Sequence, residues 1–140
     1  MPNWAYSVKE IDPERSVRCS GRELRISPKA ATEICRSIKG MRLEEAKELL
    51  EAVVSKNRPI AYRRYKKEVP HKSHSERWHA GRYPTKAATK ILGLLEELQS
   101  NAEYKGLDVD RIRIVHAASQ RGMKTQRIVS RAYGRATPSH

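Results

Sequence analysis

Residues 81–106 read GRYPTKAATKILGLLEELQSNAEYKG, and this stretch decides the fold. Pro84 stands where a helix can begin, because proline fits the first helical turn, and Gly106 follows the expected end near Tyr104. Between them the apolar residues recur every three or four positions, which is the spacing of one helix face. A helix over about 84–104 with a wide buried face is therefore predicted. That face consists of Ala87, Ala88, Ile91, Leu92, Leu95, Leu98 and Ala102.

Two shorter helices are predicted on the N-terminal side of this one. Ser27 and Pro28 suit the N-cap and the first helical position of the first helix, and Gly40 suits the residue after its end. The second helix spans about 42–55 and has glutamates opposite its apolar stripe. The two apolar stripes are Ala31, Ile34, Cys35 and Ile38 in the first helix, and Leu43, Ala46, Leu50 and Val53 in the second.

Three further segments favour β-strands. Residues 22–26 alternate charged and apolar side chains, and residues 111–117 and 126–131 place isoleucine and valine among basic residues. Residues 120–123 can turn between the last two, so a hairpin over about 111–135 is predicted. Ten residues in each strand, at about 3.3 Å per residue, give an arm of roughly 30–35 Å. Because an isolated two-stranded hairpin is marginally stable, we expect this arm to become ordered against a partner.

The positive charge of the chain is concentrated in two segments. The sequence has 29 basic and 16 acidic residues, which gives a formal net charge of +13. Residues 58–90 hold 10 basic and 2 acidic residues, and residues 111–140 hold 7 basic and no acidic residues. The rest of the chain sums to −2. A near-neutral body with two basic segments is typical of a protein that binds a polyanion.

The first basic segment has the composition of an RNA-binding loop. Residues 58–83 show neither helix nor strand periodicity, and a loop of this length in a compact domain is usually functional. Aromatic side chains alternate with cations along it; aromatic rings stack on unpaired bases, while cations follow the phosphate backbone. In a second interpretation, Trp78 and Tyr83 pin the loop to the core. The aromatic residues of the loop are Tyr62, Tyr65, Trp78 and Tyr83.

In the predicted hairpin, basic residues recur every three or four positions. Arginine can bind phosphate oxygens with two hydrogen bonds, and neutralising several phosphates releases counterions, so binding would be strong and sensitive to salt. The alternative is a solvated basic tail, but the isoleucine and valine residues favour an ordered arm. The basic residues are Arg121, Lys124, Arg127, Arg131 and Arg135.

Other classes of function have little support in the sequence. His71, His74 and His79 lie close together, but structural zinc sites usually include cysteine pairs and the chain has no C-x-x-C motif. Cys19 and Cys35 are expected to be reduced thiols. The chain has no nucleotide-binding or hydrolase motif, no secretory signal in its first ten residues and no apolar run of about 18 residues. We expect no catalytic residue, metal, cofactor or membrane span.

Four motifs, in their order along the chain, resemble one protein family. They are RELRISPK at 22–29, GRYPTKAA at 81–88, NAEYKGLD at 101–108 and RAYGRA at 131–136. The family is the universal large-subunit ribosomal protein twenty-two, called seventeen in eukaryotes, and the resemblance covers nearly the whole chain. The long loop over 58–83 and the opening NWAYS at 3–7 resemble the archaeal branch.

This resemblance implies an α+β fold in which three helices pack on a small antiparallel three-stranded sheet and a long β-hairpin projects from the body. It implies a single ribosomal protein domain over 1–140, with the globular body at about 1–57 and 84–116, the basic loop at 58–83 and the hairpin at about 111–135. Relatives continue past Gly134-Arg135-Ala136 into a strand that closes the sheet, whereas the present sequence ends at His140.

The resemblance also implies a structural constituent of the large ribosomal subunit, located in the cytoplasm and without enzymatic activity. Its expected partners are large-subunit ribosomal RNA, whose domains it bridges during assembly, neighbouring ribosomal proteins, and the nascent polypeptide in the exit tunnel. The hairpin tip that lines this tunnel is expected at Gln120, Arg121, Gly122, Met123 and Lys124. Contacts with RNA are expected at Arg58, Arg63, Arg64, Lys66, Lys67, Lys72, Arg77, Arg82, Lys86, Arg121, Lys124, Arg127, Arg131, Tyr133 and Arg135.

A small basic protein that shapes DNA or chromatin is the alternative, because the charge balance alone permits it. Proteins that read a duplex usually place a basic helix in a groove. Here the predicted helices are neutral or acidic on their outer faces, and the charge lies in a loop and a hairpin. An enzyme acting on RNA would need a general base or a metal cluster, for which the sequence offers no candidate.

Overall fold

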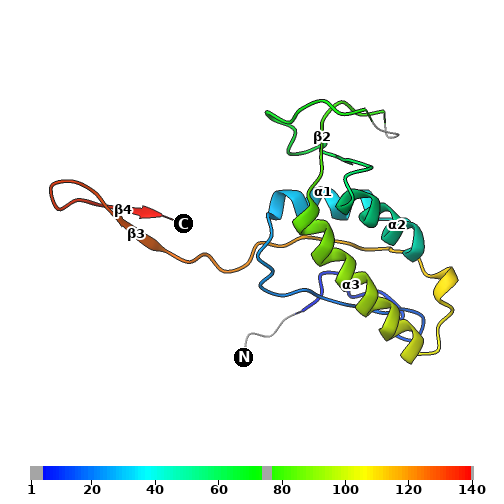
Figure 1. The fold of residues 1–140 in the computed structure, drawn as a ribbon. Helices are drawn as coiled ribbons and strands as arrows, with labels where there is room; N and C mark the ends of the chain where they lie inside the picture. The colour runs from blue at the N-terminus through cyan, green and yellow to red at the C-terminus, as the bar shows by residue number, and fades with distance from the viewer. Residues whose placement is uncertain (1–4, 74–76, 140) are drawn as a thin grey trace.

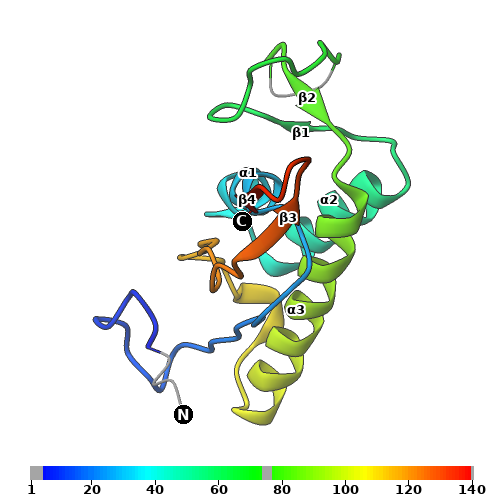
Figure 2. The same ribbon diagram turned by 90° about the vertical axis from the view of Figure 1, so that its left-hand side faces the viewer.

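The computed structural model describes residues 5–73 and 77–139. The helices form a body from which two segments extend in different directions. Residues 58–83 lie at the top of Figure 1, and the C-terminal arm, residues 115–139, extends to its left. In Figure 2 the arm comes toward the viewer, while the first segment stays at the top. The fold is therefore mixed α and β, with the two basic segments outside the helical body.

The predicted helices are present close to their predicted limits. In the described residues they are followed by one short 3₁₀ helix, and the strands are gathered into two separate antiparallel pairs. The helices are α1 (Pro28–Ile38), α2 (Leu43–Val54), α3 (Thr85–Tyr104) and the 3₁₀ helix η1 (Val109–Arg111). The strands are β1 (Ile60–Ala61), β2 (Gly81–Arg82), β3 (Arg127–Ser130) and β4 (Ala136–Ser139).

Local capping explains where the first two helices begin. The Ser27 hydroxyl accepts a hydrogen bond from the Ala30 N–H at 3.5 Å, which satisfies one of the unpaired amides of the first turn. The Glu45 carboxylate accepts the Arg42 N–H at 3.3 Å in the first turn of α2. Gly40 follows α1 with a φ of +89°, a left-handed conformation that glycine adopts without steric cost.

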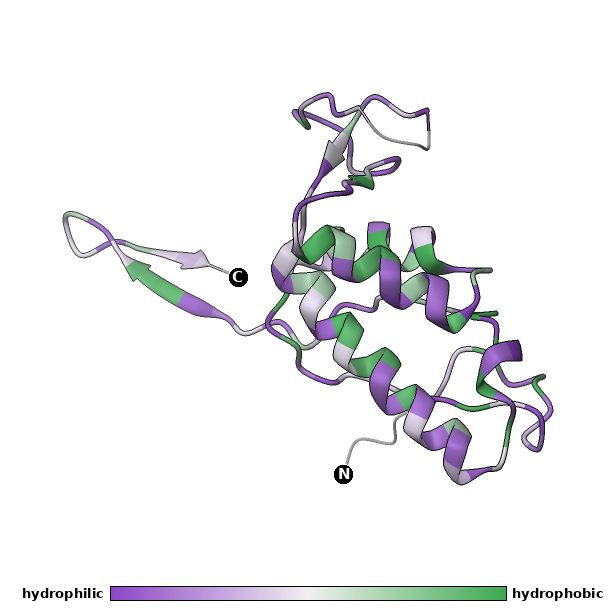
Figure 3. Cartoon of the chain, turned by 45° about the vertical axis from the view of Figure 1, so that its right-hand side comes forward, coloured by the Kyte–Doolittle hydropathy of each residue, from purple (hydrophilic) through white to green (hydrophobic). Residues whose placement is uncertain are grey.

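The core lies where α2 packs along α3 and α1 packs on α3 and β1. Ile34, Leu50 and Val53 have no exposed surface, and burying each such side chain contributes about 2 kcal/mol. Figure 3 shows hydrophobic residues recurring between hydrophilic ones along the helices. The apolar stripes predicted from the sequence therefore form the core, with Cys35, Leu92 and Leu98 at its partly exposed edge.

An extended segment after η1 is held against the turn between α1 and α2. The Gly40 N–H donates to the Ile114 carbonyl at 2.7 Å, the Ile114 N–H donates to the Met41 carbonyl at 2.9 Å, and the Leu43 N–H donates to the Ile112 carbonyl at 3.1 Å. Ile114 is buried in the core, whereas Val115 is 70% exposed. This part of the predicted strand over 111–117 therefore belongs to the body, and its backbone partners differ from the predicted ones.

The expected three-stranded sheet is replaced in the described residues by the two strand pairs. The predicted strand over 22–26 is absent, because Glu23 has a φ of +50° and the Ile26 N–H donates to the Leu24 carbonyl at 2.8 Å, so the chain turns there. Gly21 approaches α3 closely: a Cβ at Gly21 would lie 2.9 Å from Leu94 Cδ1. Residues 21–26 therefore pack as an irregular segment.

The basic loop is more ordered than its lack of periodicity suggests. At its base β1 pairs antiparallel with β2, in the register Ile60 opposite Arg82 and Ala61 opposite Gly81. Farther out, the Tyr62 N–H donates to the Ala80 carbonyl at 2.9 Å. Consecutive residues at this base are buried, so the alternation typical of a half-exposed strand is missing. The sequence prediction of a loop without regular structure over 58–83 is wrong for these residues.

The hairpin is real but lies farther along the chain than predicted. β3 pairs with β4, in the register Ile128 opposite Pro138 and Val129 opposite Thr137, so the partner of 127–130 is not 111–117. The turn is formed by Tyr133 (φ +58°) and Gly134 (φ +66°). Two consecutive positive φ angles are what a type I′ hairpin turn requires, and a glycine second residue favours it. The described residues thus show a short hairpin, not the long one expected.

The placement of the hairpin tip at 120–124 is consequently wrong. Gln120, Arg121, Gly122, Met123 and Lys124 are exposed, belong to no strand and precede β3. The Arg131 N–H donates to the Arg135 carbonyl at 2.8 Å across the actual turn. The tip of the arm is therefore formed by residues 131–135.

The N-terminal segment around residues 13–18 is hydrogen-bonded to the C-terminal end of α3. Lys105 Nζ donates to the Pro13 and Ser16 carbonyls, both at 3.0 Å, and the Asn101 side-chain amide donates to the Arg18 carbonyl at 3.4 Å. Asn3 and Trp4, from the opening that resembles the archaeal branch, lie outside the described residues.

Candidate nucleic-acid interface

The basic loop is fixed to the body by a buried carboxylate. Glu33 lies on the inner side of α1 and has no exposed surface. One carboxylate oxygen accepts the N–H groups of Arg64 at 2.8 Å and Tyr65 at 2.9 Å, and the other accepts the Arg63 N–H at 3.2 Å. Successive N–H groups that converge on one anion form a concave binding site for it, here occupied by a side chain of the same protein.

A tryptophan holds the two sides of the loop together. The indole N–H of Trp78 donates to the Tyr62 carbonyl at 2.9 Å, and the Trp78 side chain is partly buried against the core. The Arg63 guanidinium lies 5.1 Å from the centre of the Trp78 ring system, and Lys66 Nζ lies 5.5 Å from it. These distances are in the range of cation–π attraction. One ring therefore positions two cations of the loop.

Two tyrosines position further cations in the same way. Arg64 lies 5.5 Å and Lys29 5.8 Å from the centre of the Tyr65 ring. Lys72 lies 5.6 Å from the centre of the Tyr83 ring. Tyr65, Trp78 and Tyr83 thus contact cations of the same chain. Trp78 also packs against the core, as the second sequence interpretation proposed for it and for Tyr83.

The root of the loop is apolar enough to change the ionisation of a tyrosine. Burial raises the pKa of Tyr62 above its ordinary value of 10.0; the nearby Arg82 opposes this shift, and the negative charge of Glu33 adds to it. Tyr62 is 6% exposed. The polar part of the loop therefore stands on a buried base.

Most of the cations that the sequence analysis selected in this segment point into solvent. Arg82 also donates to the Glu68 carbonyl at 3.3 Å, and Lys86 lies beyond the loop in the first turn of α3. Exposed cations of this kind can be reached by a phosphate backbone. The exposed ones are Arg63, Arg64, Lys66, Lys67, Lys72, Arg77, Arg82 and Lys86.

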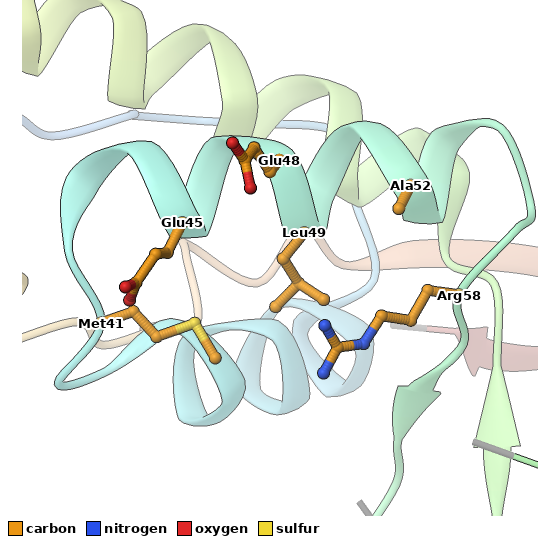
Figure 4. A pocket seen from close by; sticks show the side chains of 6 residues that line it. All are labelled: Met41, Glu45, Glu48, Leu49, Ala52 and Arg58. Atoms are coloured by element: carbon orange, nitrogen blue, oxygen red, sulfur yellow. The ribbon is translucent and has the colours of Figure 1, made fainter. Parts of the chain in front are cut away.

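Arg58 is the exception among these candidates. It is partly buried, and Figure 4 shows its guanidinium beside Leu49, in an open groove along α2 that Glu45 and Glu48 also line. The two carboxylates add negative charge to this groove, whereas the loop is basic. Arg58 therefore does not join the cation cluster around Trp78 and Tyr65.

The arm exposes both charge and apolar surface. All residues of β3 and β4 are exposed, including Ile128 at 78% and Val129 at 45%, and Tyr133 at the turn is 98% exposed. Met123 in the segment before β3 is 93% exposed. Exposed apolar groups of this size usually mark a surface that a partner covers. The basic candidates Arg121, Lys124, Arg127, Arg131 and Arg135 are exposed beside them.

No other chemistry is indicated by the described residues. Among them no group of three or more metal-ligating side chains occurs, and no helix has the length and apolar content needed to cross a bilayer. His71 and His79 make an edge-to-face contact with ring centres 5.2 Å apart, and His74 lies outside the described residues. Cys19 and Cys35 are free thiols, and burial raises the pKa of both.

Known proteins resemble this chain over almost its full length. The family of ribosomal protein L22p/L17e matches residues 19–140. The chain belongs to this family. A large ribosomal subunit protein uL22 from Methanopyrus kandleri is 50% identical over 139 residues, which cover 97% of this chain and 87% of the relative. A protein with the same name from Archaeoglobus fulgidus is 50% identical over 133 residues, covering 95% and 86%.

A third protein of this name, from Methanocaldococcus jannaschii, is 46% identical over 138 residues, covering 99% of this chain and 88% of the relative. The similarity to these archaeal proteins places the chain in the archaeal branch of the L22p/L17e family. The resemblance found from the four sequence motifs is thereby confirmed. Because this is a family of ribosomal proteins, ribosomal RNA is the polyanion to consider for the two basic segments.

Two residues of the interface were missed by the sequence analysis. Glu33 was not selected, although it stands within the apolar stripe of α1, next to Ile34 and one turn after Ala30. An acid at such a position is a signal of a buried, fully hydrogen-bonded carboxylate. Lys29 was also missed, because only the folded chain brings it over the Tyr65 ring. Both residues come from α1, which thus supports the loop.

Proposed function

We propose that this chain is a structural constituent of the large ribosomal subunit that binds large-subunit ribosomal RNA through two surfaces. The first is the basic loop, residues 58–83 with Lys86, and the second is the arm, residues 115–139. The chain acts in the cytoplasm as part of the ribosome, as one domain and without catalysis. Family membership and the archaeal relatives support the assignment to the large ribosomal subunit. The concentration of positive charge outside the helical body supports the assignment of the two RNA-binding surfaces.

The observation that carries the proposal is the prearranged set of cations around Trp78 and Tyr65. Arg63, Lys66 and Arg64 are held over rings of the same loop at 5.1, 5.5 and 5.5 Å, although like charges repel each other. Bringing phosphates to such a set releases counterions and relieves the repulsion. Structured RNA offers closely spaced phosphates for this purpose.

The arm fits a narrow, RNA-walled passage. Its strands have no covered face in the free protein, so RNA or protein on both sides would bury Ile128 and Val129 while phosphates meet its arginines. We place the tip of this arm, residues 131–135, at the wall of the nascent-peptide tunnel, because the resemblance assigns the hairpin tip to that wall. The arm then bridges RNA domains and neighbouring ribosomal proteins along its length.

A protein that reads duplex DNA with a helix is disfavoured by the position of the charge. The outer face of α2 carries Glu44, Glu48 and Glu51, all exposed, so this helix would be repelled from a groove.

The test is binding to large-subunit ribosomal RNA at several salt concentrations. Replacing Arg127, Arg131 and Arg135 with alanine should weaken binding and lower the slope of log affinity against log salt by about 0.7–0.9 for each lost phosphate contact. The matched control replaces Lys9, Arg15 and Lys56, which are exposed and outside both surfaces, and so changes the net charge equally. An unchanged slope in the arm variant, or equal losses in both variants, would reject the arm as an RNA-binding surface.

A further inference from the structure

We propose that Glu33 is a positioning residue for RNA binding: it fixes the main chain of residues 63–65, so that the cations of the basic loop are arranged before RNA arrives. The inference rests on the proposed function, because it names the residue that prepares one of the two RNA-binding surfaces. Glu33 itself is buried under the loop and does not reach the RNA.

The geometry leaves the loop little freedom at this point. Three consecutive N–H groups, those of Arg63, Arg64 and Tyr65, donate to one carboxylate at 3.2, 2.8 and 2.9 Å. Hydrogen bonds to an ionised acceptor are stronger than neutral ones, especially in a dry site. Because α1 is a rigid element of the core, Glu33 ties the loop backbone to the body. Two of the tied residues, Arg63 and Arg64, and the next residue, Lys66, are the cations whose side chains lie over Trp78 and Tyr65.

Fixing the backbone determines where the cations lie. With the N–H groups of 63 and 64 directed inward, Arg63 extends to the Trp78 ring at 5.1 Å and Arg64 to the Tyr65 ring at 5.5 Å. Lys29, one turn before Glu33 on α1, lies 5.8 Å from the centre of the same Tyr65 ring. A flexible loop would have to order all these side chains during binding, which would lower the affinity.

The charge of Glu33 makes this role separable from simple electrostatics. A negative charge beneath an RNA-binding surface repels phosphate, so removing it should tighten binding if charge alone matters. If Glu33 acts by positioning, removing the charge should weaken binding instead. The two explanations therefore predict opposite signs for the same substitution.

The experiment compares Glu33→Gln with Glu48→Gln in the full chain, using a large-subunit ribosomal RNA transcript at several salt concentrations. Glu48 is exposed on α2, so the control removes the same charge away from the loop. We expect Glu33→Gln to bind about tenfold more weakly, with a lower salt slope because fewer phosphates are engaged, while Glu48→Gln binds as the native protein does or slightly more tightly. All proteins are compared well below their unfolding temperatures, so that global stability does not enter.

Equal or tighter binding by Glu33→Gln would overturn the inference, whereas failure of the native protein to bind would instead overturn the proposed function. Amide exchange in the native free protein gives a second test that needs no variant. The N–H groups of 63–65 should exchange slowly before RNA is added. Exchange as fast as that of Lys66 and Lys67, the exposed residues next to them, would show that Glu33 does not hold the loop in advance.

Discussion

The indole N–H of Trp78 donates a 2.9 Å hydrogen bond to the main-chain oxygen of Tyr62. This bond joins the returning side of the basic loop to its outgoing side, just above the pairing of β1 with β2. Together with the bonds that Glu33 accepts, it closes the loop at its root. The two sides of the loop are therefore joined to each other and to the body at several points.

Replacing Trp78 with leucine should loosen this surface. The change removes a hydrogen bond with a net worth of about 1 kcal/mol and two cation–π contacts of about 0.5–1 kcal/mol each. We expect the free energy of unfolding to fall by about 1–3 kcal/mol and the affinity for ribosomal RNA to fall severalfold, as measured by denaturant unfolding and by titration with RNA. Trp78→Phe keeps a ring for Arg63 and Lys66 and should lose less affinity; a phenylalanine variant as weak as the leucine variant would contradict the cation–π role.

Stability at high pH should depend on Tyr62. Its pKa in the folded protein is raised above the ordinary value of 10.0, mainly because the side chain is buried. The neutral phenol is therefore favoured by folding, and this contribution is complete below about pH 10 and is lost as the pH rises through the higher pKa of the folded state. We expect the native protein to lose stability above about pH 10 faster than Tyr62→Phe, measured by urea unfolding at each pH. Parallel losses in the two proteins would show that Tyr62 does not titrate in a buried site.

The helices could be predicted because their signals are local. Ser27 and Pro28 mark the start of α1, and the apolar residues of α3 repeat at the spacing of one helix face. Each of these features acts within a few residues, so the sequence alone contains them. The concentration of positive charge in the basic loop and the arm could likewise be predicted from the sequence.

The loop root and the hairpin register could not be predicted because they depend on distant partners. Glu33 meets residues 63–65, which are 30 to 32 positions away, and no local pattern encodes that meeting. The sequence predicts the hairpin too early because residues 120–123, which include Gly122, are also able to turn. The actual turn has Gly134 at its second position, but Tyr133 before it is a bulky residue that seldom has a positive φ, so the sequence does not show the usual turn signal.

The packing of α2 on α3 should dominate the stability of the body. Leu50 has no exposed surface, so Leu50→Ala removes buried methyl groups and leaves a cavity. The expected loss is about 2–5 kcal/mol in the free energy of unfolding, measured by denaturant titration. Val54 on the same helix is 38% exposed, and Val54→Ala should change the free energy by no more than about 0.5 kcal/mol. Similar losses at the two positions would contradict this account of the core.

The turn of the arm should require glycine at position 134. Gly134 has a φ of +66°, and a side chain in that conformation costs about 1 kcal/mol or somewhat more. Gly134→Ala should therefore reduce pairing between β3 and β4, seen by NMR as weaker contacts between Val129 and Thr137. Gly122→Ala is the control, because a Cβ there meets no atom within 4 Å and the backbone is not left-handed. Equal effects at the two glycines would place the turn elsewhere.

The arm should be protected only when the ribosome covers it. Both strands are exposed along their full length, and a two-stranded hairpin without a covered face is marginally stable in water. In the free protein the amides of residues 117–135 should therefore exchange within seconds, while those of α3 around Ile91 and Leu95, which are buried, exchange slowly. In assembled large subunits both groups should be slow, because RNA and neighbouring proteins exclude water from the arm. Exchange measured by mass spectrometry on the two samples decides this, and strong protection of 117–135 in the free protein would show that the arm is ordered without its partner.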